Sequence, residues 1–253
     1  MFLVFSKEKI HTYIVSILAV ATLIGVASIN SNNAIVTSAS ERLVPIYNVQ
    51  TNETKVAFTM NCAWSADDID KILEVLEDNN VKITFFMVGT WIDKYPDEVK
   101  KIYNAGHEIG SHSNTHPHVN QLSSEKNLEE IHLSVDKIKS LTGYTTNLYR
   151  TPYGEYNDMV IKVAQDNGFY PIHWNIDTLD YEELTGDQMW DRIKNKLQNG
   201  SIILSHNGTA HTADSLDMLI KNIKSQGFDI VKVSDLIYKD NYSINSNGTQ
   251  ILK

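Results

Sequence analysis

The chain has 253 residues, 42% of them apolar and 21% charged, an ordinary globular composition that supports one sizeable core and excludes a wholly disordered chain. Its 22 basic and 31 acidic residues give a formal charge of −9 at pH 7, which argues against a nucleic-acid coat or a basic membrane-surface protein. The single cysteine, Cys62, excludes an intrachain disulfide and a structural zinc cluster built from several thiolates.

The N-terminus carries an uncharged apolar run from Tyr13 to Ile29, preceded by Lys7 and Lys9. Its length lies between the core of a signal peptide and the roughly 17 to 25 residues of a membrane span. We therefore expect residues 1–30 to form a hydrophobic helix that directs export, as a cleaved signal peptide or a retained membrane anchor, with a buried core helix as the alternative. The protein is then extracytoplasmic. Residues 31–52, rich in Asn, Ser and Thr, are expected to be a linker.

Residues 53–240 alternate short apolar runs with segments in which apolar residues recur every three or four positions. The expected strands are 55–60, 82–87, 107–111, 147–150, 169–174, 201–205 and 229–232. The expected helices are 68–77, 96–105, 124–141, 159–167, 188–197 and 215–225. This alternation predicts a parallel α/β barrel or a doubly wound sheet, and the barrel is favoured because no dinucleotide-type glycine loop follows the first strand. The tail, residues 241–253, is expected to be unpacked.

Polar residues that are unusual for a core follow these strands directly. In an α/β barrel the carboxyl ends of the strands form one face, and that face carries the active site. Five separated segments are therefore expected to converge on one cavity. Their polar residues are Asn61, Cys62, His112, His116, Arg150, Asp177, Asp180 and His206.

His112 and His116 stand four residues apart, which places both imidazoles on one side of a helical turn, as metal ligands often are. Because the chain has 9 histidines, the spacing alone is weak, and the position after a strand strengthens it. We therefore expect the pair to bind a divalent metal, with a solvated histidine-rich loop as the alternative. His107 and His118 are expected to be structural or to support the ligands.

Five segments, in this order, resemble the polysaccharide deacetylases with the NodB homology domain, carbohydrate esterase family 4. They are KVAFTMNCAW, SHSNTHPH, RTPYG, WNIDTLDY and ILSHN, and they span about residues 55–232. The run CAW followed by acidic residues, together with the N-terminal apolar segment, is most similar to the sporulation-associated branch. The resemblance implies a distorted (β/α)7 barrel and an exported, metal-dependent hydrolase that removes N-acetyl groups from a cell-wall polysaccharide such as peptidoglycan.

The resemblance also implies roles for the first residues of the site. His112 and His116 would bind the metal, usually zinc, which activates water and polarises the acetyl carbonyl. Arg150 would orient the catalytic base, with a buried ion pair to an aspartate as the alternative. The backbone N–H of Tyr153 would complete the oxyanion hole.

The remaining roles concern the departing amine and the sugar. The resemblance implies that His206 protonates the amine, and that Asp177 or Asp180 orients and charges His206. For one of the substrate-binding residues, Leu204, core packing is the alternative to lining an acetyl pocket. The implied substrate-binding residues are Leu204, Pro152 and Trp174.

Most relatives carry two aspartates after the first strand, a base and a metal ligand, where this chain has Asn61 and Cys62. An amide cannot take a proton from water at neutral pH, and loss of a positioned base typically costs ~10²- to 10⁴-fold in rate. Water bound to zinc, with a pKa of about 7, would still allow slow turnover. Cys62 is either a thiolate ligand or a small buried filler. Asp67 and Asp68 either supply a carboxylate or begin a helix.

Two functions therefore remain open. The first is an exported de-N-acetylase of cell-wall glycan, slowed by Asn61. The second is a catalytically silent glycan-binding or structural wall protein on the same fold. The histidine pair, Arg150 and His206 favour the enzyme, whereas the pair Asn61 and Cys62 favours the silent protein.

Overall fold

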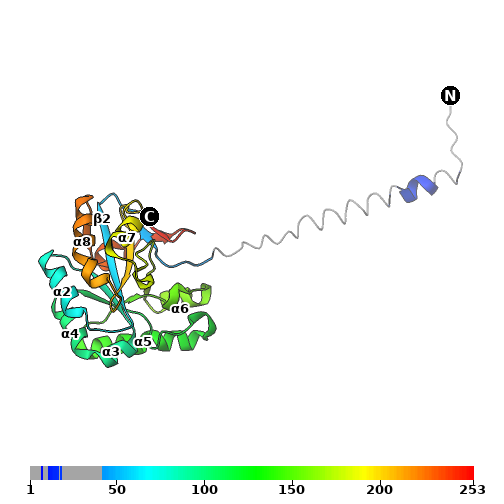
Figure 1. The fold of residues 1–253 in the computed structure, drawn as a ribbon. Coiled ribbons are helices and arrows are strands. Elements are labelled where there is room, and N and C mark those ends of the chain that lie inside the picture. Colours follow the sequence, from blue (N-terminus) through cyan, green and yellow to red (C-terminus); the bar gives the residue numbers. More distant parts are fainter. Residues whose placement is uncertain (1–6, 8–10, 17, 19–41) are drawn as a thin grey trace. The chain divides into compact units, whose positions relative to one another are not determined.

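The computed structural model describes residues 7, 11–16, 18 and 42–253 (Figure 1). Within residues 42–253, seven strands form the continuous path β6-β5-β4-β3-β2-β8-β7, in which all neighbours are parallel, and β9 pairs with the first half of β2. The two end strands do not pair with each other, so the sheet is a curled, open barrel. The strands are β2 (Lys55–Cys62), β3 (Thr84–Met87), β4 (Glu108–Ser111), β5 (Leu148–Tyr149), β6 (Tyr170–Pro171), β7 (Ile176–Asp177), β8 (Ile202–His206) and β9 (Asp229–Val231).

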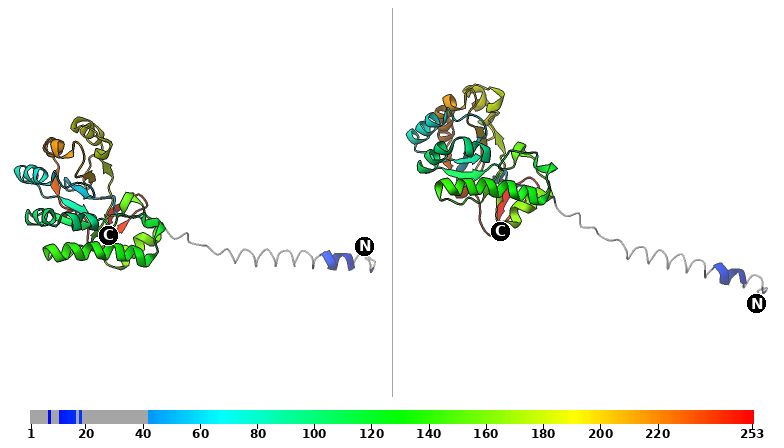
Figure 2. Two further views of the ribbon diagram at one scale, coloured as in Figure 1. Left: turned by 60° about the horizontal axis from the view of Figure 1, so that its bottom comes forward. Right: turned by 90° about the horizontal axis from the view of Figure 1, so that it is seen from below.

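Helices lie outside the strands, as two further views show (Figure 2). They are α2 (Ile69–Asp78), α3 (Gly89–Lys94), α4 (Pro96–Asn104), α5 (Ser124–Thr142), α6 (Asp158–Asp166), α7 (Gly186–Ile193), α8 (Thr212–Ser225) and α9 (Val233–Leu236). The predicted parallel α/β fold with a distorted barrel is confirmed. The short elements α3, α9 and β7 were not predicted, because segments of two to six residues carry too little periodicity to be recognised.

Strand β2 separates two apolar layers, because successive side chains of a strand point to opposite faces. Phe58, Met60 and Cys62 belong to the layer between the sheet and the helices. Ala57 belongs to the layer inside the curl of the sheet. Asn61, two pleats further along, shares the inner face with Ala57.

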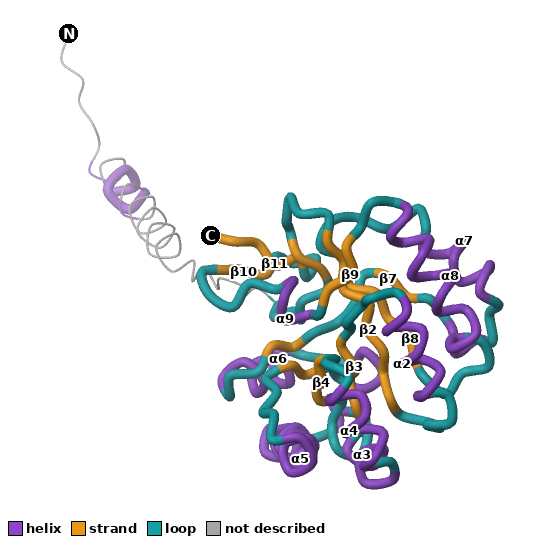
Figure 3. The backbone as a smooth tube through the Cα atoms, turned by 90° about the vertical axis from the view of Figure 1, so that its left-hand side faces the viewer, coloured by secondary structure: helices purple, strands orange, loops and turns teal. Residues whose placement is uncertain are grey.

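The C-terminal residues form a small second sheet with the segment that precedes β2 (Figure 3). Its strands are β1 (Asn48–Val49), β10 (Tyr242–Ile244) and β11 (Thr249–Leu252), in the order β1-β11-β10. Gln250 is fully buried, and its side chain bonds both the N–H and the carbonyl of Tyr238. The expectation that 241–253 is unpacked, and that all of 31–52 is a linker, was therefore wrong: the compact unit spans 42–253.

The N-terminal hydrophobic helix falls almost entirely outside the described residues. Of the predicted segment 1–30, residues 11–16 are helical. Among the residues that the structure describes, no helix has the length and apolar character needed to cross a membrane. Export through this segment stays a prediction.

Strand register brings the predicted polar residues level with one another. Asn61 of β2 lies opposite His206 of β8. On the other side, Met87 of β3 lies opposite Ser111 of β4, which in turn lies opposite Tyr149 of β5. His112 and Arg150 each come one residue later, so the carboxyl ends of the strands carry these groups at one edge.

Candidate active site

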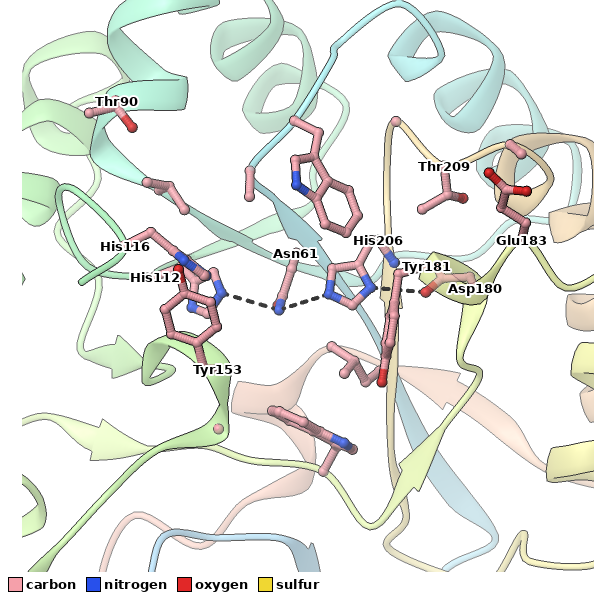
Figure 4. A pocket seen from close by; sticks show the side chains of 18 of the residues that line it. Asn61, Thr90, His112, His116, Tyr153, Asp180, Tyr181, Glu183, His206 and Thr209 are labelled. Carbon is pink, nitrogen blue, oxygen red and sulfur yellow. Dashed lines mark hydrogen bonds and ion pairs between the residues drawn. The ribbon is translucent and has the colours of Figure 1, made fainter. Parts of the chain in front are cut away.

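A cleft of about 890 Å³ opens at this edge of the sheet (Figure 4). Eight of the predicted site residues line this cleft. They are Asn61, His112, His116, Tyr153, Trp174, Asp180, Leu204 and His206. Cys62, Pro152, Arg150 and Asp177 do not line it. The convergence of separate segments on one cavity, predicted from the strand ends, is what the structure shows.

Asn61 lies at the centre of the site and is buried. Arg150 Nη1 donates to Asn61 Oδ1 at 2.9 Å, and because guanidinium groups only donate, this contact fixes which end of the amide is oxygen. The amide nitrogen Nδ2 must then face the two imidazoles, at 3.3 Å from His112 Nε2 and 3.5 Å from His206 Nε2. Asn61 thus donates toward both rings and offers no acceptor to a water between them.

The histidine pair predicted to bind a metal, His112 and His116, has lowered pKa values, and the hydrogen bond of His112 fixes which of its ring nitrogens faces the cleft. His112 Nδ1 lies 2.9 Å from the Arg150 carbonyl oxygen, which can only accept, so Nε2 is left as an acceptor. Burial, followed by the neighbouring His116, holds the pKa of His112 well below its ordinary value. Burial also lowers the pKa of His116, whose ring centroid lies 4.8 Å from that of His112. Both groups are therefore in the state that a metal ligand requires.

The residues present do not complete a metal site. Catalytic zinc usually has three protein ligands and one open position. Within the described part of the chain, no group of three His, Cys, Asp or Glu side chains is placed to hold an ion. The nearest further group is Asn61 Nδ2, a donor that points at His112 Nε2. His112 and His116 supply two nitrogens only, so zinc binding stays a prediction, and we expect it to be weak.

Cys62 lies on the opposite face of β2 from Asn61. Its side chain is fully buried in the layer between the sheet and the helices. Burial, with a smaller contribution from Asp68, raises the pKa of the thiol well above its usual value. Of the two alternatives for Cys62, this position fits the buried filler and not the thiolate ligand, which would need a lowered pKa.

Arg150 is fully buried beneath Asn61 without a carboxylate partner in the described ion pairs. Its guanidinium donates to Asn61, to Thr59 Oγ1 and to the carbonyls of Ile172 and His173. It also lies 4.0 Å from the centroid of the Phe86 ring. Burial lowers the pKa of Arg150 to about 9. The alternative of a buried ion pair with an aspartate is not seen among the described residues. The guanidinium instead donates to the Asn61 side chain.

His206 and Asp180 form a hydrogen-bonded pair. His206 Nδ1 lies 2.9 Å from Asp180 Oδ1, and Asp180 Oδ2 accepts from the His206 backbone N–H and from Thr212. Asp177 has a different task, since it accepts from the Leu179 N–H and from the Tyr181 hydroxyl. Between the two predicted orienting aspartates, the structure places Asp180 in contact with His206.

The RTPYG segment turns sharply below the cleft. Tyr153 has φ +57°, and its N–H has no acceptor among the described backbone contacts, which leaves it available as an oxyanion donor. Its ring is 60% exposed and stacks on His118 at 4.5 Å, while His118 pairs with Glu155. Pro152 is the buried residue of this turn and does not line the cleft.

Leu204 and Trp174 both line the cleft, and Leu204 is 2% exposed. The position of Leu204 agrees with both predicted alternatives, because its side chain is packed in the core and also forms part of the cleft wall. Asp68 supplies no carboxylate to the cleft's centre, because it accepts from the Gly208 N–H and from Asn207. The lining residues that the sequence analysis missed include Trp64 and Tyr181, whose large exposed rings lie in segments without periodicity.

Two buried histidines outside the cleft predict how stability depends on pH. Burial, followed by Arg150, lowers the pKa of His173 to about 3, and burial, followed by Lys82, lowers the pKa of His107 to about 4. Unfolded histidine has a pKa of about 6.5, so between these values the unfolded chain binds more protons. The contribution of the two neutral histidines to the free energy of unfolding is therefore complete above pH 6.5. It falls on acidification, by up to about 1.4 kcal/mol per pH unit for each group.

Urea denaturation at pH 7.5, 6.5 and 5.5 measures this dependence. His107→Gln removes one titrating group, so we expect it to lower the overall stability but to flatten the pH slope. An identical slope in the parent and in His107→Gln would contradict the assignment of a neutral buried imidazole.

Comparison with known proteins extends these observations. The sequence profile named polysaccharide deacetylase matches residues 48–172. A peptidoglycan-N-acetylglucosamine deacetylase of Bacillus cereus is 31% identical over 180 residues, which are 70% of this chain and 66% of that protein. An uncharacterised protein of Bacillus subtilis, YlxY, is 33% identical over 193 residues, which are 76% of this chain and 60% of that protein.

Solved structures include a carbohydrate esterase family 4 pseudoenzyme from Bacillus anthracis, with 32% identity, a TM-score of 0.74, and coverage of 78% of this chain and 69% of that one. A mutant of it is described as having restored enzymatic activity, with the same identity and TM-score and 72% of its chain covered. Enzymes and pseudoenzymes therefore both occur at about the same distance from this sequence.

Proposed function

Because the chain belongs to the polysaccharide deacetylase family, we propose that its cleft binds an N-acetylated glycan of the cell-wall type and that Asn61 leaves it almost without deacetylase activity. The observation that carries this proposal is the orientation of the Asn61 amide, whose oxygen is held by Arg150 and whose nitrogen faces His112 and His206. Hydrolysis needs a proton acceptor at this place, and the amide is a donor there.

The second candidate function is slow deacetylation, and the His206–Asp180 pair favours it. Asp180 holds the imidazole by Nδ1, so Nε2 is directed into the cleft, where a protonated His206 can give a proton to a departing amine. Arg150 and the free N–H of Tyr153 are also in place. A mutant of the Bacillus anthracis pseudoenzyme has restored enzymatic activity. This supports the idea that an inactive cleft of this family can lack only a few of the groups that catalysis needs.

Location and biological setting belong to the same proposal. The apolar run at 13–29 supports an extracytoplasmic protein, anchored or released, that meets the cell wall. The peptidoglycan deacetylase among the relatives supports a peptidoglycan-like glycan as the ligand. Membership of the sporulation-associated branch stays a prediction.

Binding and turnover are measured separately on the purified full chain. Isothermal titration with oligomers of N-acetylglucosamine reports binding, and mass spectrometry of the same oligomers reports loss of acetyl groups. We expect saturable binding with very slow acetate release, and His206→Gln should abolish that residual release while binding is kept. Rapid release by the parent would support the enzyme, and no binding to any N-acetylated glycan would exclude the proposed function.

A further inference from the structure

The segment after β4, residues 112–118, which we call the histidine loop, contains two residues in an unfavourable backbone conformation. Ser113 has φ +68° and His116 has φ +58°. Residues other than glycine rarely adopt this left-handed conformation, and they keep it only where surrounding contacts hold the backbone. Because the backbone at His116 decides where its ring lies, whatever holds the histidine loop also places this ring at the wall of the cleft.

The carboxylate of Glu130, on α5, accepts four hydrogen bonds from the histidine loop. Oε2 accepts from Ser113 Oγ at 2.6 Å, from the Asn114 N–H at 2.9 Å and from the Thr115 N–H at 2.8 Å. Oε1 accepts from Thr115 Oγ1 at 2.9 Å. Partial burial alone would raise the pKa of Glu130, but the hydrogen bonds from Ser113 and Thr115 outweigh it and lower this pKa. The group is therefore an ionised acceptor at neutral pH.

The carbonyl groups of the same residues bond to the start of α3. The Gly89 N–H donates to the Ser113 carbonyl at 2.9 Å, and the Thr90 N–H donates to the Asn114 carbonyl at 2.8 Å. A Cβ at Gly89 would lie 2.9 Å from the Asn114 Cα, so the loop packs here as closely as a glycine allows. The carbonyls are thus paired with α3, whereas the N–H groups of Asn114 and Thr115 depend on Glu130. Of the described residues, no other accepts from these two N–H groups.

Helix α5 presents two further polar contacts to this region. Lys137, seven residues after Glu130 and so on the same side of the helix, donates to Asn114 Oδ1 at 2.7 Å. Asn127, three residues before Glu130, is buried and donates to the Val119 carbonyl at 3.0 Å. A single helix therefore contacts the histidine loop and the turn that follows it, with Glu130 at the centre.

The position of the histidine loop decides what His116 contacts in the cleft. Its ring centroid lies 4.4 Å from that of Tyr153, with 69° between the planes (Figure 4). Tyr153 itself has φ +57° and belongs to a different segment, the turn after β5. Both residues line the cleft, so the contact between their rings joins two of the segments that form its wall.

We propose that Glu130 is a positioning residue of the cleft: by accepting from Asn114 and Thr115, it keeps His116 against Tyr153 in the form that receives a ligand. Glu130 does not line the cleft and acts only through the loop. A cleft wall fixed in advance loses less conformational entropy when a ligand binds. The effect on glycan binding rests on the proposed function, whereas the placement of His116 does not.

The test removes the carboxylate and compares a matched position. Glu130→Leu removes all four acceptor contacts, and Glu130→Gln keeps one oxygen that can accept from the same N–H groups. Glu129→Leu is the control, because Glu129 is exposed and pairs with Lys126 of the same helix. In the purified full chain, we expect amide hydrogen exchange at Asn114 and Thr115, measured by NMR, to be at least about tenfold faster in Glu130→Leu than in the parent. Glu130→Gln should keep part of the protection, and Glu129→Leu should match the parent.

Two further measurements distinguish positioning from mere stabilisation of the loop. The nuclear Overhauser contact between the rings of His116 and Tyr153 is expected in the parent, absent in Glu130→Leu and retained in Glu130→Gln. Calorimetric titration with the N-acetylglucosamine tetramer is expected to show binding about tenfold weaker in Glu130→Leu, because the binding-competent form is then a minor one. Glu130→Gln should recover most of this affinity.

Each outcome decides one of the two proposals. Parent-like exchange and an unchanged ring contact in Glu130→Leu overturn the role of Glu130. Faster exchange with an unchanged ring contact also overturns it, because the residue then stabilises the loop without placing His116. A lost ring contact with parent-like tetramer binding overturns the effect on the ligand. A parent that binds no N-acetylated glycan overturns the proposed function, and the ring contact still decides the role of Glu130. Unfolding midpoints confirm that the variants are folded, and Glu130→Ala replaces Glu130→Leu if the leucine prevents folding.

Discussion

Asn61→Asp is expected to raise acetate release from N-acetylglucosamine oligomers by about 10²-fold or more, the contribution of a positioned general base. One carboxylate oxygen would keep the hydrogen bond from Arg150 Nη1, now as an ion pair with a guanidinium that has no carboxylate partner among the described residues of the parent. The other oxygen would replace the amide nitrogen that faces His112 and His206.

This exchange also changes the contact made at His206 Nε2. In the parent, the Asn61 amide nitrogen, which can only donate, faces this atom. A carboxylate at the same place can accept from Nε2–H, the group that would give its proton to the departing amine. One substitution therefore supplies the base and prepares the acid, and this is why the expected effect is large.

Acetate release is measured for the parent, Asn61→Asp and the double variant Asn61→Asp/His206→Gln, in buffers with and without added zinc. The double variant is the control, because a carboxylate without the acid should lose most of the gain. Metal content of each protein is measured in parallel. If neither the parent nor Asn61→Asp releases acetate from several glycans, the cleft is not that of an enzyme and the glycan-binding function remains.

The convergence of the site could be predicted from sequence because a parallel sheet leaves little freedom. Once strands such as β2 and β8 are recognised, their carboxyl ends must share an edge, and Asn61 and His206 indeed lie in register. The choice between Asp177 and Asp180 could not be predicted in this way. Both follow the same predicted strand, 169–174, and which one reaches His206 depends on a tight turn with positive φ at Leu179.

Contacts between distant segments account for what else was missed. Strand β11 is stabilised by pairing with β1, some two hundred residues earlier in the sequence. The four residues of β11 alone do not predict this pairing. Trp64 and Ser65 lie against Gly208, again a contact between loops that are distant in the sequence. The position of Cys62, by contrast, follows from simple alternation: if Asn61 faces the cleft, its neighbour on the strand faces away.

That alternation makes two neighbouring positions respond in opposite ways to the same change. Cys62→Asp is expected to lower the free energy of unfolding by about 3 to 5 kcal/mol, because it places an unpaired carboxylate among apolar side chains. Asn61→Asp, which gains Arg150 as a partner, is expected to keep the parent's stability to within about 1 kcal/mol. Cys62→Ala, which removes only a small apolar group, should cost about 1 kcal/mol.

Urea denaturation of these three variants beside the parent measures the differences, and pH sharpens the comparison. Burial raises the pKa of a carboxyl group above its unfolded value of about 3.9, so the folded Cys62→Asp variant holds its proton more tightly than the unfolded chain. Its deficit relative to the parent should therefore grow as pH rises from 5 to 7.5. A Cys62→Asp protein as stable as the parent, with zinc bound in stoichiometric amount, would contradict the burial of this side chain. Such a result would require position 62 to turn into the cleft and complete a metal site with His112 and His116, as the two aspartates of most relatives imply.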